Sequence, residues 1–251
     1  MKNGIDVSKH NGTIDWGAVK VSGKVDFAIL RAGYGKLASQ KDVQFERNYE
    51  ECKMYGIPVG AYWYSYAITP AEAEAEARTF LHVIKNKQFE YPVWFDIEER
   101  KAFNTGMKNC SAMIRAFCSV MEQAGYWCGV YCSTSAIKSY IDADTQKRYA
   151  MWVAEWGNNL NYNGDAAIWQ YSEKGRITGI NGNVDLDRAY VDYPELIKAA
   201  GKNGYVKPIE TPAVKPVEPA ETPTEPSAKN TVQVTMQVNG KAYSGVLTAI
   251  E

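Results

Sequence analysis

Short apolar segments recur along the first 190 or so residues, and a polar or helix-forming stretch follows each of them. Most are continuously apolar rather than alternating, which is typical of strands covered on both faces of a parallel sheet. Strands that alternate with helices in this way predict a closed β/α barrel. The strand candidates are 4–8, 27–35, 58–66, 92–98, 126–133, 151–156, 166–172 and 183–190.

Helix signals lie between several of these strands. Thr69 is followed by Pro70 and Glu72, a pattern that predicts an N-cap, a first helical residue and a capping box. A second helix is expected over about 111–122, before Gly125. Helices are therefore expected mainly in the early part of the barrel.

The last two connections of the barrel have a different character. Segments 157–165 and 173–182 are short and rich in Gly and Asn, so neither holds a full helix. We therefore predict an α/β fold: an irregular barrel of about eight strands, with reduced helices in its second half.

The composition changes after residue 205. Segment 206–229 carries prolines three to four residues apart and no aromatic residue, which predicts an extended, semi-rigid linker. In segment 230–251, Val or Met occupies every second position from 232 to 238, before Asn239-Gly240, which predicts a β-hairpin. We expect a folded domain over 1–205, the Pro-rich linker, and a small C-terminal β element. A lone hairpin is marginal in water, so this element is expected to self-associate or to bind another surface.

Charge and hydropathy exclude several function classes. The net charge is −1, which predicts no nucleic-acid binding. No apolar run approaches the roughly 20 residues that span a bilayer, so membrane insertion is not expected. The start, MKNGIDVSKHNG, has no apolar core typical of a secretory signal, and we expect synthesis in the cytoplasm without a signal peptide.

The metal-binding residue types are scarce. Five cysteines occur without a CxxC pair, and we expect them to be reduced thiols. The two histidines, His10 and His82, argue against a zinc site. No cofactor is expected.

Acidic residues follow or lie within three of the expected strands. Asp96 and Glu98 come at the end of YPVWFDIEER, two residues apart. Asp6 lies near the end of the first strand, and Asp185 and Asp187 lie in the eighth, which adjoins the first when a barrel closes. Barrel enzymes place their chemistry at the carboxyl ends of strands. We therefore expect these carboxylates to converge in one pocket.

Each acid also has a structural alternative. Asp6 could cap a turn with Ser8, and Asp187 could pair with Arg188 or Arg100. Glu99 and Arg100 resemble a solvated loop and are assigned no role.

Crowded carboxylates raise one another's pKa, which keeps one of them protonated as a proton donor. The 17 Tyr and 7 Trp supply flat, partly apolar surfaces suited to sugars. No phosphate loop, nucleophile elbow or metal-ligand set is visible in the sequence. Paired acids and aromatic walls together indicate glycoside hydrolysis.

Seven motifs, in order, resemble the glycoside hydrolase family 25 lysozymes: GIDVSKHNGTIDW, FAILRAGYG, GAYWYS, VWFDIEE, WVAEW, IWQYS and INGNVDLD. The resemblance covers residues 1 to about 195. It implies a flattened, irregular β/α barrel and N-acetylmuramidase activity of the kind common in phage endolysins. One departure is Trp63, where many members carry His.

The resemblance also implies roles for individual residues. Glu98 would be the general acid, and Asp96 would orient the substrate's acetamido group or stabilise charge at the anomeric carbon. Asp6 and Asp185 would complete the catalytic acid cluster. The residues that would bind substrate are Tyr62, Tyr64, Tyr131, Trp156, Gln170 and Asp187.

The implied reaction is cleavage of the β-1,4 bond between N-acetylmuramic acid and N-acetylglucosamine in bacterial peptidoglycan. An endolysin released through a membrane pore fits this, and a bacterial wall enzyme exported by another route is the alternative. An inactive glycan-binding protein and a related barrel glycosidase acting on another N-acetylated glycan also stay open. The chitinase pattern D-x-x-D-x-D-x-E is absent, because Tyr91 and Trp94 occupy its first two acidic positions. A carboxylate nucleophile, acetamido assistance and an inverting water all remain open as mechanisms.

Overall fold

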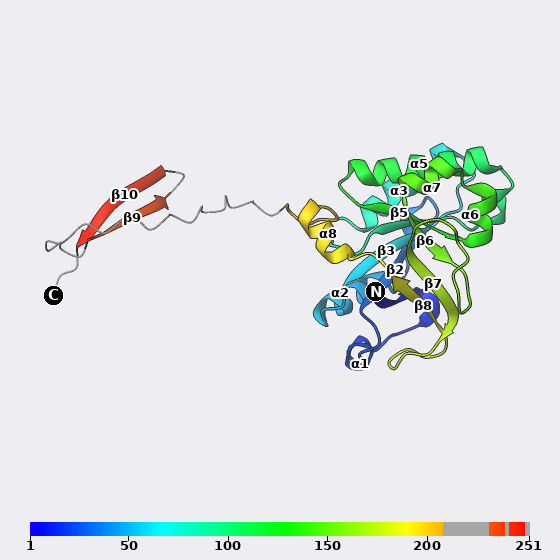
Figure 1. Cartoon of the computed structure of the whole chain (residues 1–251), viewed down its shortest axis with the longest axis horizontal. Helices are drawn as coiled ribbons and strands as arrows, with labels where there is room; N and C mark the ends of the chain where they lie inside the picture. Colours follow the sequence, from blue (N-terminus) through cyan, green and yellow to red (C-terminus); the bar gives the residue numbers. More distant parts are fainter. Residues whose placement is uncertain (208–230, 239–240, 249–251) are drawn as a thin grey trace. The chain divides into compact units, whose positions relative to one another are not determined.

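The computed structural model describes residues 1–207, 231–238 and 241–248 (Figure 1). The chain divides into two compact units, Met1–Ile209 and Glu210–Glu251. The larger unit contains the barrel, and the smaller contains two strands. Residues 208–229 of the expected linker lie outside the described residues.

Eight strands of the larger unit close into a barrel in sequence order. All pairs from β1 to β7 are parallel, and β8 is antiparallel to both β7 and β1. Each strand falls on one of the expected segments, so the predicted irregular barrel is confirmed. The strands are Lys2–Val7 (β1), Phe27–Tyr34 (β2), Val59–Tyr64 (β3), Val93–Asp96 (β4), Cys128–Ser133 (β5), Ala150–Ala154 (β6), Ala166–Gly175 (β7) and Val184–Ala189 (β8).

The direction of β8 follows from its short connection. Only residues 176–183 separate β7 from β8. A parallel crossover needs a dozen or more residues, whereas a short loop makes an antiparallel pair. The reversal brings the start of β8 beside the end of β1, where Asp6 and Asp185 are Cα partners.

Helices cover the outside of the barrel mainly between β1 and β6. The two longest, α3 and α5, pack against each other along one side (Figure 1). Among the described residues no helix lies between β6 and β7 or between β7 and β8, which confirms the reduced second half. The helices are Trp16–Val21 (α1), Phe45–Met54 (α2), Pro70–Val83 (α3), Arg100–Phe103 (α4), Met107–Gln123 (α5), Thr134–Tyr140 (α6), Ala143–Arg148 (α7) and Tyr193–Ala200 (α8), with 3-10 turns at Lys9–Asn11 and Ala38–Gln40.

The start of α3 agrees with the sequence pattern. The Thr69 hydroxyl accepts a hydrogen bond from the Glu72 amide at 3.3 Å, and Pro70 is the first helical residue. The Glu72 carboxylate accepts from the amide of Ile68, one residue before the cap. By contrast α5 begins at Met107, four residues earlier than expected, behind a glycine N-cap that gave no signal.

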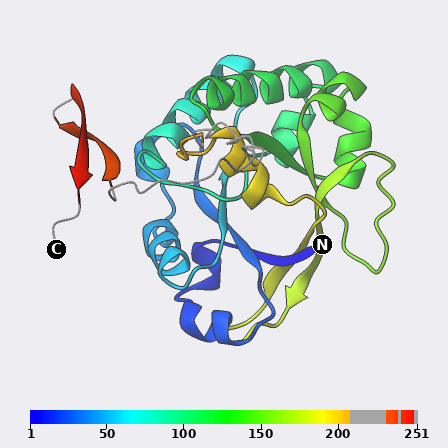
Figure 2. The same cartoon turned by 60° about the vertical axis from the view of Figure 1, so that its left-hand side comes forward.

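Two clusters of buried side chains form the core. One lies between the barrel and the helices, and the other fills the barrel interior around Ile29, Trp94, Trp152 and Ile168. Tyr193 and Ile197 of α8 belong to the interior cluster, so α8 closes the amino-terminal end of the barrel (Figure 2). The five cysteines are buried and carry free thiols.

Residues after α8 form hydrogen bonds to other segments at this closed end of the barrel. Asn203 is fully buried with φ of 55°, a left-handed conformation that Asn tolerates better than most residues. Its side chain accepts from the Trp127 amide at 2.6 Å and donates to the Tyr91 carbonyl at 2.9 Å. One residue thus links the chain after α8 to the segments that lead into β4 and β5.

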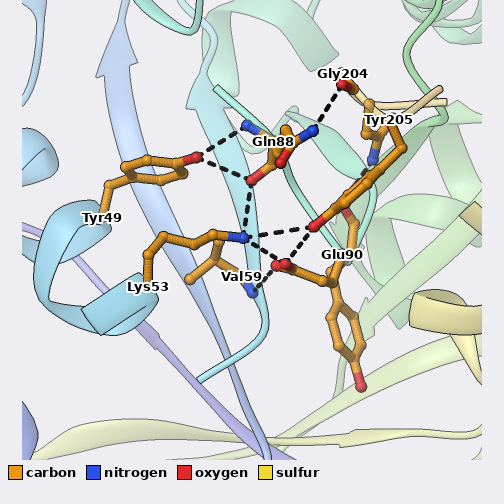
Figure 3. Close-up of polar contacts among 9 residues, drawn as sticks. Tyr49, Lys53, Val59, Gln88, Glu90, Gly204 and Tyr205 are labelled. Atoms are coloured by element: carbon orange, nitrogen blue, oxygen red, sulfur yellow. Dashed lines mark hydrogen bonds and ion pairs between the residues drawn. The ribbon is translucent and has the colours of Figure 1, made fainter. Parts of the chain in front are cut away.

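A polar network continues from this point (Figure 3). The Glu90 carboxylate pairs with Lys53, accepts from the Tyr205 hydroxyl, and accepts from the Val59 amide at 3.0 Å. The Gln88 side chain donates to the Gly204 carbonyl at 3.0 Å. Residues 203–205 are therefore an integral part of the amino-terminal end of the barrel, which α8 closes.

The smaller unit contains β9 (Thr231–Val238) and β10 (Lys241–Thr248), which pair in antiparallel register from Lys241–Val238 to Thr248–Thr231. The expected Asn239-Gly240 turn lies outside the described residues. Over the described parts of both units, no helix has the length and apolarity needed to cross a membrane.

Candidate active site

The predicted acids gather at the carboxyl end of the parallel strands, opposite α8. Asp6 is the last residue but one of β1 and Asp96 is the last of β4, and they are 6% and 3% exposed. Asp187 on β8 is fully buried, and Asp185 is half-buried. Glu98 lies two residues beyond β4, in a loop rather than on the strand as expected, and is exposed. The cluster therefore has a buried floor and one carboxyl at its mouth.

Gln170 on β7 connects several of the predicted residues. Its Nε2 donates to Asp6 Oδ2 at 2.7 Å. Its Oε1 accepts from the Tyr131 hydroxyl at 3.0 Å and from the Trp156 indole at 3.1 Å. Trp156 is 57% exposed, so this bond orients an aromatic ring at the cleft surface. An oriented, exposed indole is suited to stack on a sugar face.

Burial governs the protonation of the floor. Burial raises the pKa of Asp6 well above its usual range, and the carboxylates of Asp187 and Asp185 raise it further. Burial raises the pKa of Asp187 to about 8, although the Trp152 indole donates to its Oδ1 at 2.8 Å. Burial, with Glu173, raises the pKa of Asp185 to about 6. Several protons are therefore shared within the cluster at neutral pH.

Asp96 and Glu98 differ in their surroundings. Burial, with the nearby Glu98, raises the pKa of Asp96 well above its usual range, and the opposing influence of Arg31 is smaller. Although Glu98 reaches solvent, the surrounding protein displaces part of its water, and this effect, with Glu99 and Asp185, raises its pKa. Two carboxyl groups with raised pKa values, one at the mouth and one buried, can hold a proton between them, and acid-catalysed glycoside cleavage uses such a pair of carboxyl groups.

Tyr62 and Tyr64 share the inner face of β3, and Tyr64 is the Cα partner of Asp96. The Tyr64 hydroxyl donates to Glu99 Oε1 at 2.8 Å. The expectation that Glu99 and Arg100 form a solvated loop is therefore wrong: Glu99 is half-buried and holds Tyr64, and Arg100 begins α4.

Trp63, the departure from the family pattern, points away from the cleft. Its indole donates to the Gly35 carbonyl at 2.9 Å, and its ring stacks on Phe80 of α3 at 5.3 Å. It therefore packs in the layer between the barrel and the helices.

The structural alternatives for two acids are not realised. Arg188 lies over the rings of Trp169 and Tyr171, at 5.6 and 4.4 Å, rather than pairing with Asp187. The Ser8 hydroxyl accepts from the His10 amide and caps the 3-10 turn.

Sequence reasoning missed one charged pair at the cleft. Arg31 Nε and Asp42 Oδ2 lie 2.7 Å apart, and their side chains are 11% and 1% exposed. The available signal was a single arginine inside the apolar run FAILRAGYG. An arginine in a buried strand requires a partner.

Two cavities of the barrel unit lie at opposite ends, and only one of them adjoins the acid cluster. A hollow of about 600 Å³ is bordered by Trp156, Tyr171, Lys174 and Arg176, so it adjoins the acid cluster through Trp156. A larger cavity of about 1140 Å³ lies at the opposite end, where β5, β6 and β7 begin, and contains none of the predicted site residues. We locate the site by its carboxyl groups rather than by cavity size. Within the described ranges, no group of three or more His, Cys, Asp or Glu side chains is arranged to hold a metal ion.

Comparison with known proteins finds similar sequences and structures among lysozymes, endolysins and autolysins. The autolytic lysozyme of Clostridium acetobutylicum is 29% identical over 185 residues, which is 73% of this chain and 54% of that protein. The chain thus spans about half the length of this curated relative. The CTP1L endolysin structure is 27% identical with a TM-score of 0.68, over 79% of this chain and 70% of that one.

The modular autolysin LytC from Streptococcus pneumoniae, solved with a synthetic peptidoglycan ligand, is 31% identical with a TM-score of 0.67. The alignment covers 74% of this chain and 46% of LytC. The sequence model of glycosyl hydrolases family 25 matches residues 5–180, a range that includes Asp6, Asp96 and Glu98. The chain therefore belongs to glycosyl hydrolases family 25.

Proposed function

We propose that this chain is a peptidoglycan muramidase that hydrolyses the β-1,4 bond between N-acetylmuramic acid and N-acetylglucosamine. The observation that carries the proposal is the contrast between Asp96 and Glu98. The pKa of each carboxyl is raised, but Asp96 is buried at the end of its strand, whereas Glu98 is exposed at the mouth of the cleft. The peptidoglycan ligand of the related LytC supports the choice of substrate.

Glu98 is the proton donor of this mechanism. Its raised pKa lets the carboxyl keep its proton to a higher pH than an ordinary glutamate does, and its exposure lets it reach the oxygen of a glycosidic bond in the cleft. After bond cleavage the same group accepts a proton from the incoming water, or bulk solvent reprotonates it.

Asp96 supplies negative charge below the reacting sugar. As a carboxylate it stabilises the positive charge that develops at the anomeric carbon, or orients the 2-acetamido group for attack. Asp185 and Asp6 bind sugar hydroxyls, whereas Asp187, which was expected to bind substrate, is fully buried and offers the substrate no surface. The anomeric configuration of the first product distinguishes retention, by a nucleophile or the acetamido group, from inversion by water.

Aromatic side chains form the walls of the substrate groove. Trp156, Tyr62, Tyr64 and Tyr131 flank the acids, and Gln170 holds Trp156 and Tyr131 in place. The hollow beyond Trp156 gives room for a glycan strand to continue past the reacting bond.

Release from a host cell as a phage endolysin fits this activity, and an exported bacterial wall enzyme is the alternative source. For the small C-terminal unit we propose self-association or wall docking, because a two-stranded hairpin is marginal on its own.

Digestion of purified peptidoglycan, with mass spectrometry of the new reducing ends, tests the proposal. Muramic acid ends support it. Glucosamine ends indicate a glucosaminidase, and no release by a folded protein that still binds the wall indicates a glycan-binding protein. Glu98→Gln is the matched control, because it keeps the shape of the side chain and removes the proton.

A further inference from the structure

The loop after β3 carries an exposed tyrosine at the mouth of the barrel. Tyr66 lies two residues beyond the end of β3 and is 51% exposed. Because β3 is parallel to β4, its chain leaves the barrel at the same end as Asp96, the last residue of β4. Trp156 follows β6, which runs in the same direction, so it lies at this end as well. The two exposed aromatic side chains therefore lie on opposite sides of β4.

Tyr66 belongs to a group of three aromatic rings. Its ring centroid lies 5.2 Å from that of Tyr64 and 6.0 Å from that of Tyr34, the last residue of β2. Both neighbours are half-buried, so Tyr66 presents the most exposed ring of the group. A flat ring that is supported from behind and open to solvent in front is suited to stack on a sugar face.

Glu76 of α3 anchors the loop that carries Tyr66. Its side chain is buried, with the residue only 2% exposed. Its Oε2 accepts from the Ser65 hydroxyl at 2.6 Å, and its Oε1 accepts from the Tyr66 amide at 3.0 Å. The Ser65 hydroxyl oxygen in turn accepts from the Ala67 amide at 3.1 Å. A buried carboxyl is costly unless it is hydrogen-bonded, so these bonds stabilise Glu76 and fix three consecutive loop residues.

Further hydrogen bonds tie this loop to the catalytic strand and to a second helix. The Ser65 amide donates to the Asp96 carbonyl at 2.9 Å. The Asn109 side chain of α5 donates to the Ile68 carbonyl at 2.9 Å. The loop is therefore held at its start and at its end. The backbone that carries the Tyr66 ring needs no ordering when a ligand binds, which lowers the entropic cost of binding.

We propose that Tyr66 stacks on a sugar ring of the glycan strand beyond the reacting bond, and that Glu76 is a positioning residue that holds Tyr66 in place. The strand then crosses the acid cluster with Trp156 on one side and Tyr66 on the other. Such a contact is made by a long glycan and missed by a short one, so it gives the enzyme a preference for extended strands. The inference rests on the proposed muramidase function.

The test of Tyr66 is KM for purified soluble glycan fragments of graded length. Tyr66→Ala should raise KM about 2- to 10-fold more for long fragments than for short ones, the effect of losing one aromatic contact. Tyr66→Phe keeps the ring and should stay near the wild type. The matched control is Tyr190→Ala: Tyr190 is 46% exposed but follows the reversed strand β8, so it lies at the opposite end of the barrel. Its KM should not change at any length. A Tyr66→Ala effect that is absent, or equal for all lengths, would overturn the proposal.

The test of Glu76 is its coupling to Tyr66. Glu76→Met removes both bonds to the loop and should raise KM selectively for long fragments, but not in a Tyr66→Ala background, since the ring it positions is then gone. Glu76→Gln offers an oxygen to the Tyr66 amide and an amide group to the Ser65 oxygen, so it should restore the wild-type KM.

Two further variants complete this test. Glu74→Met, on the same helix, breaks an ion pair with Arg78 at 3.7 Å and should leave KM unchanged. Ser65→Ala removes one of the two bonds to Glu76 and should give a smaller effect in the same direction, which keeps the test independent of the folding of Glu76→Met. A lower Tm with no length-dependent change in KM in the Glu76 or Ser65 variant would show a purely structural role and overturn the positioning claim.

A binding measurement separates this inference from the proposed function. Calorimetry with the full-length Glu98→Gln protein measures the affinity for long and short glycan fragments without hydrolysis. Adding Tyr66→Ala should weaken the binding of long fragments more than that of short ones, and equal weakening overturns the proposal. If the wild type releases no reducing ends from peptidoglycan, the proposed function fails. The calorimetric comparison still decides the role of Tyr66 in that case, and a folded protein that binds no fragment overturns both.

Discussion

Asp6 and Asp185 are directly opposite each other in the antiparallel pairing of β1 with β8, the strand that closes the barrel and runs opposite to the other seven. Because β8 is reversed, its first residues lie at the end of the barrel where the parallel strands finish. Asp185, near the start of β8, therefore joins the acid cluster, whereas in a parallel strand the same position would lie at the other end. The arrangement concentrates negative charge behind Glu98, because Asp185 is one of the groups that raise the pKa of Glu98.

Glu98→Gln should fold normally and lose nearly all activity, because an amide cannot donate the proton. General acid catalysis contributes about 10²–10⁴-fold. Residual activity on purified peptidoglycan above roughly a tenth of wild type, with an unchanged Tm, would contradict the acid role, since even the low end of the cited range is about 10²-fold.

Glu99→Gln and Asp185→Asn should both move the basic limb of the pH profile to lower pH. Each removes a negative charge that raises the pKa of Glu98, so Glu98 then loses its proton at lower pH. The Glu99 effect should be the larger, since Glu99 is the stronger of the two influences. The amide oxygen introduced by Glu99→Gln can still accept from Tyr64, so binding should change little. Asp6→Asn is the comparison, because it should reduce activity with a smaller shift of this limb.

Asp187→Asn should stabilise the protein at alkaline pH. Burial raises the folded-state pKa of Asp187 to about 8, above its unfolded value, so its protonated form favours folding. This stability is fully present below about pH 4 and is lost as pH rises through about 8. The variant should therefore match the wild type near pH 4 and exceed it in Tm by a margin that grows as pH rises toward 8, because each unit of pKa shift corresponds to about 1.4 kcal/mol of stability. Equal Tm differences at both pH values would contradict this account.

Asn203→Ala should destabilise the barrel by about 2–4 kcal/mol, because it leaves the Trp127 amide and the Tyr91 carbonyl without their partner and strains a left-handed residue. Chemical denaturation measures the change. Asn203→Gly relieves the strain but not the lost bonds, so it should be intermediate. Tyr205→Phe, which removes one bond to Glu90, should cost less than Asn203→Ala.

Much of the fold could be predicted because each strand is a short apolar run bounded by turn residues. Asp6, Asp96 and Glu98 could be placed together because parallel strands end at one edge of a barrel. The direction of β8 depends on the length of the loop before it, and the apolar pattern of the strands does not predict that direction. The bond between Tyr64 and Glu99 depends on how the loop after β4 turns, and no periodicity records that turn. The ion pair of Arg31 was overlooked because its partner, Asp42, lies in an irregular segment after β2 that has no periodic pattern.

The end of the barrel unit determines where the tail is best removed. A cut after Gly204 would delete Tyr205 and its bond to Glu90, so a loss of activity could reflect the barrel itself. A cut after Lys207 keeps this network and removes the linker and both strands of the smaller unit.

Truncation after Lys207 should leave kcat/KM on soluble glycan fragments and the Tm of the barrel unchanged. It should lower the apparent mass in light scattering if the hairpin self-associates, or the binding to intact cell walls if it docks there, because unpaired strand edges recruit further strands. A charge placed on the alternating apolar row, Val234→Lys, should reproduce the truncation in the full-length chain, whereas Gln233→Lys, at an exposed position, should not. A truncated protein identical to the full chain in mass, wall binding and lysis would show that the tail has neither role.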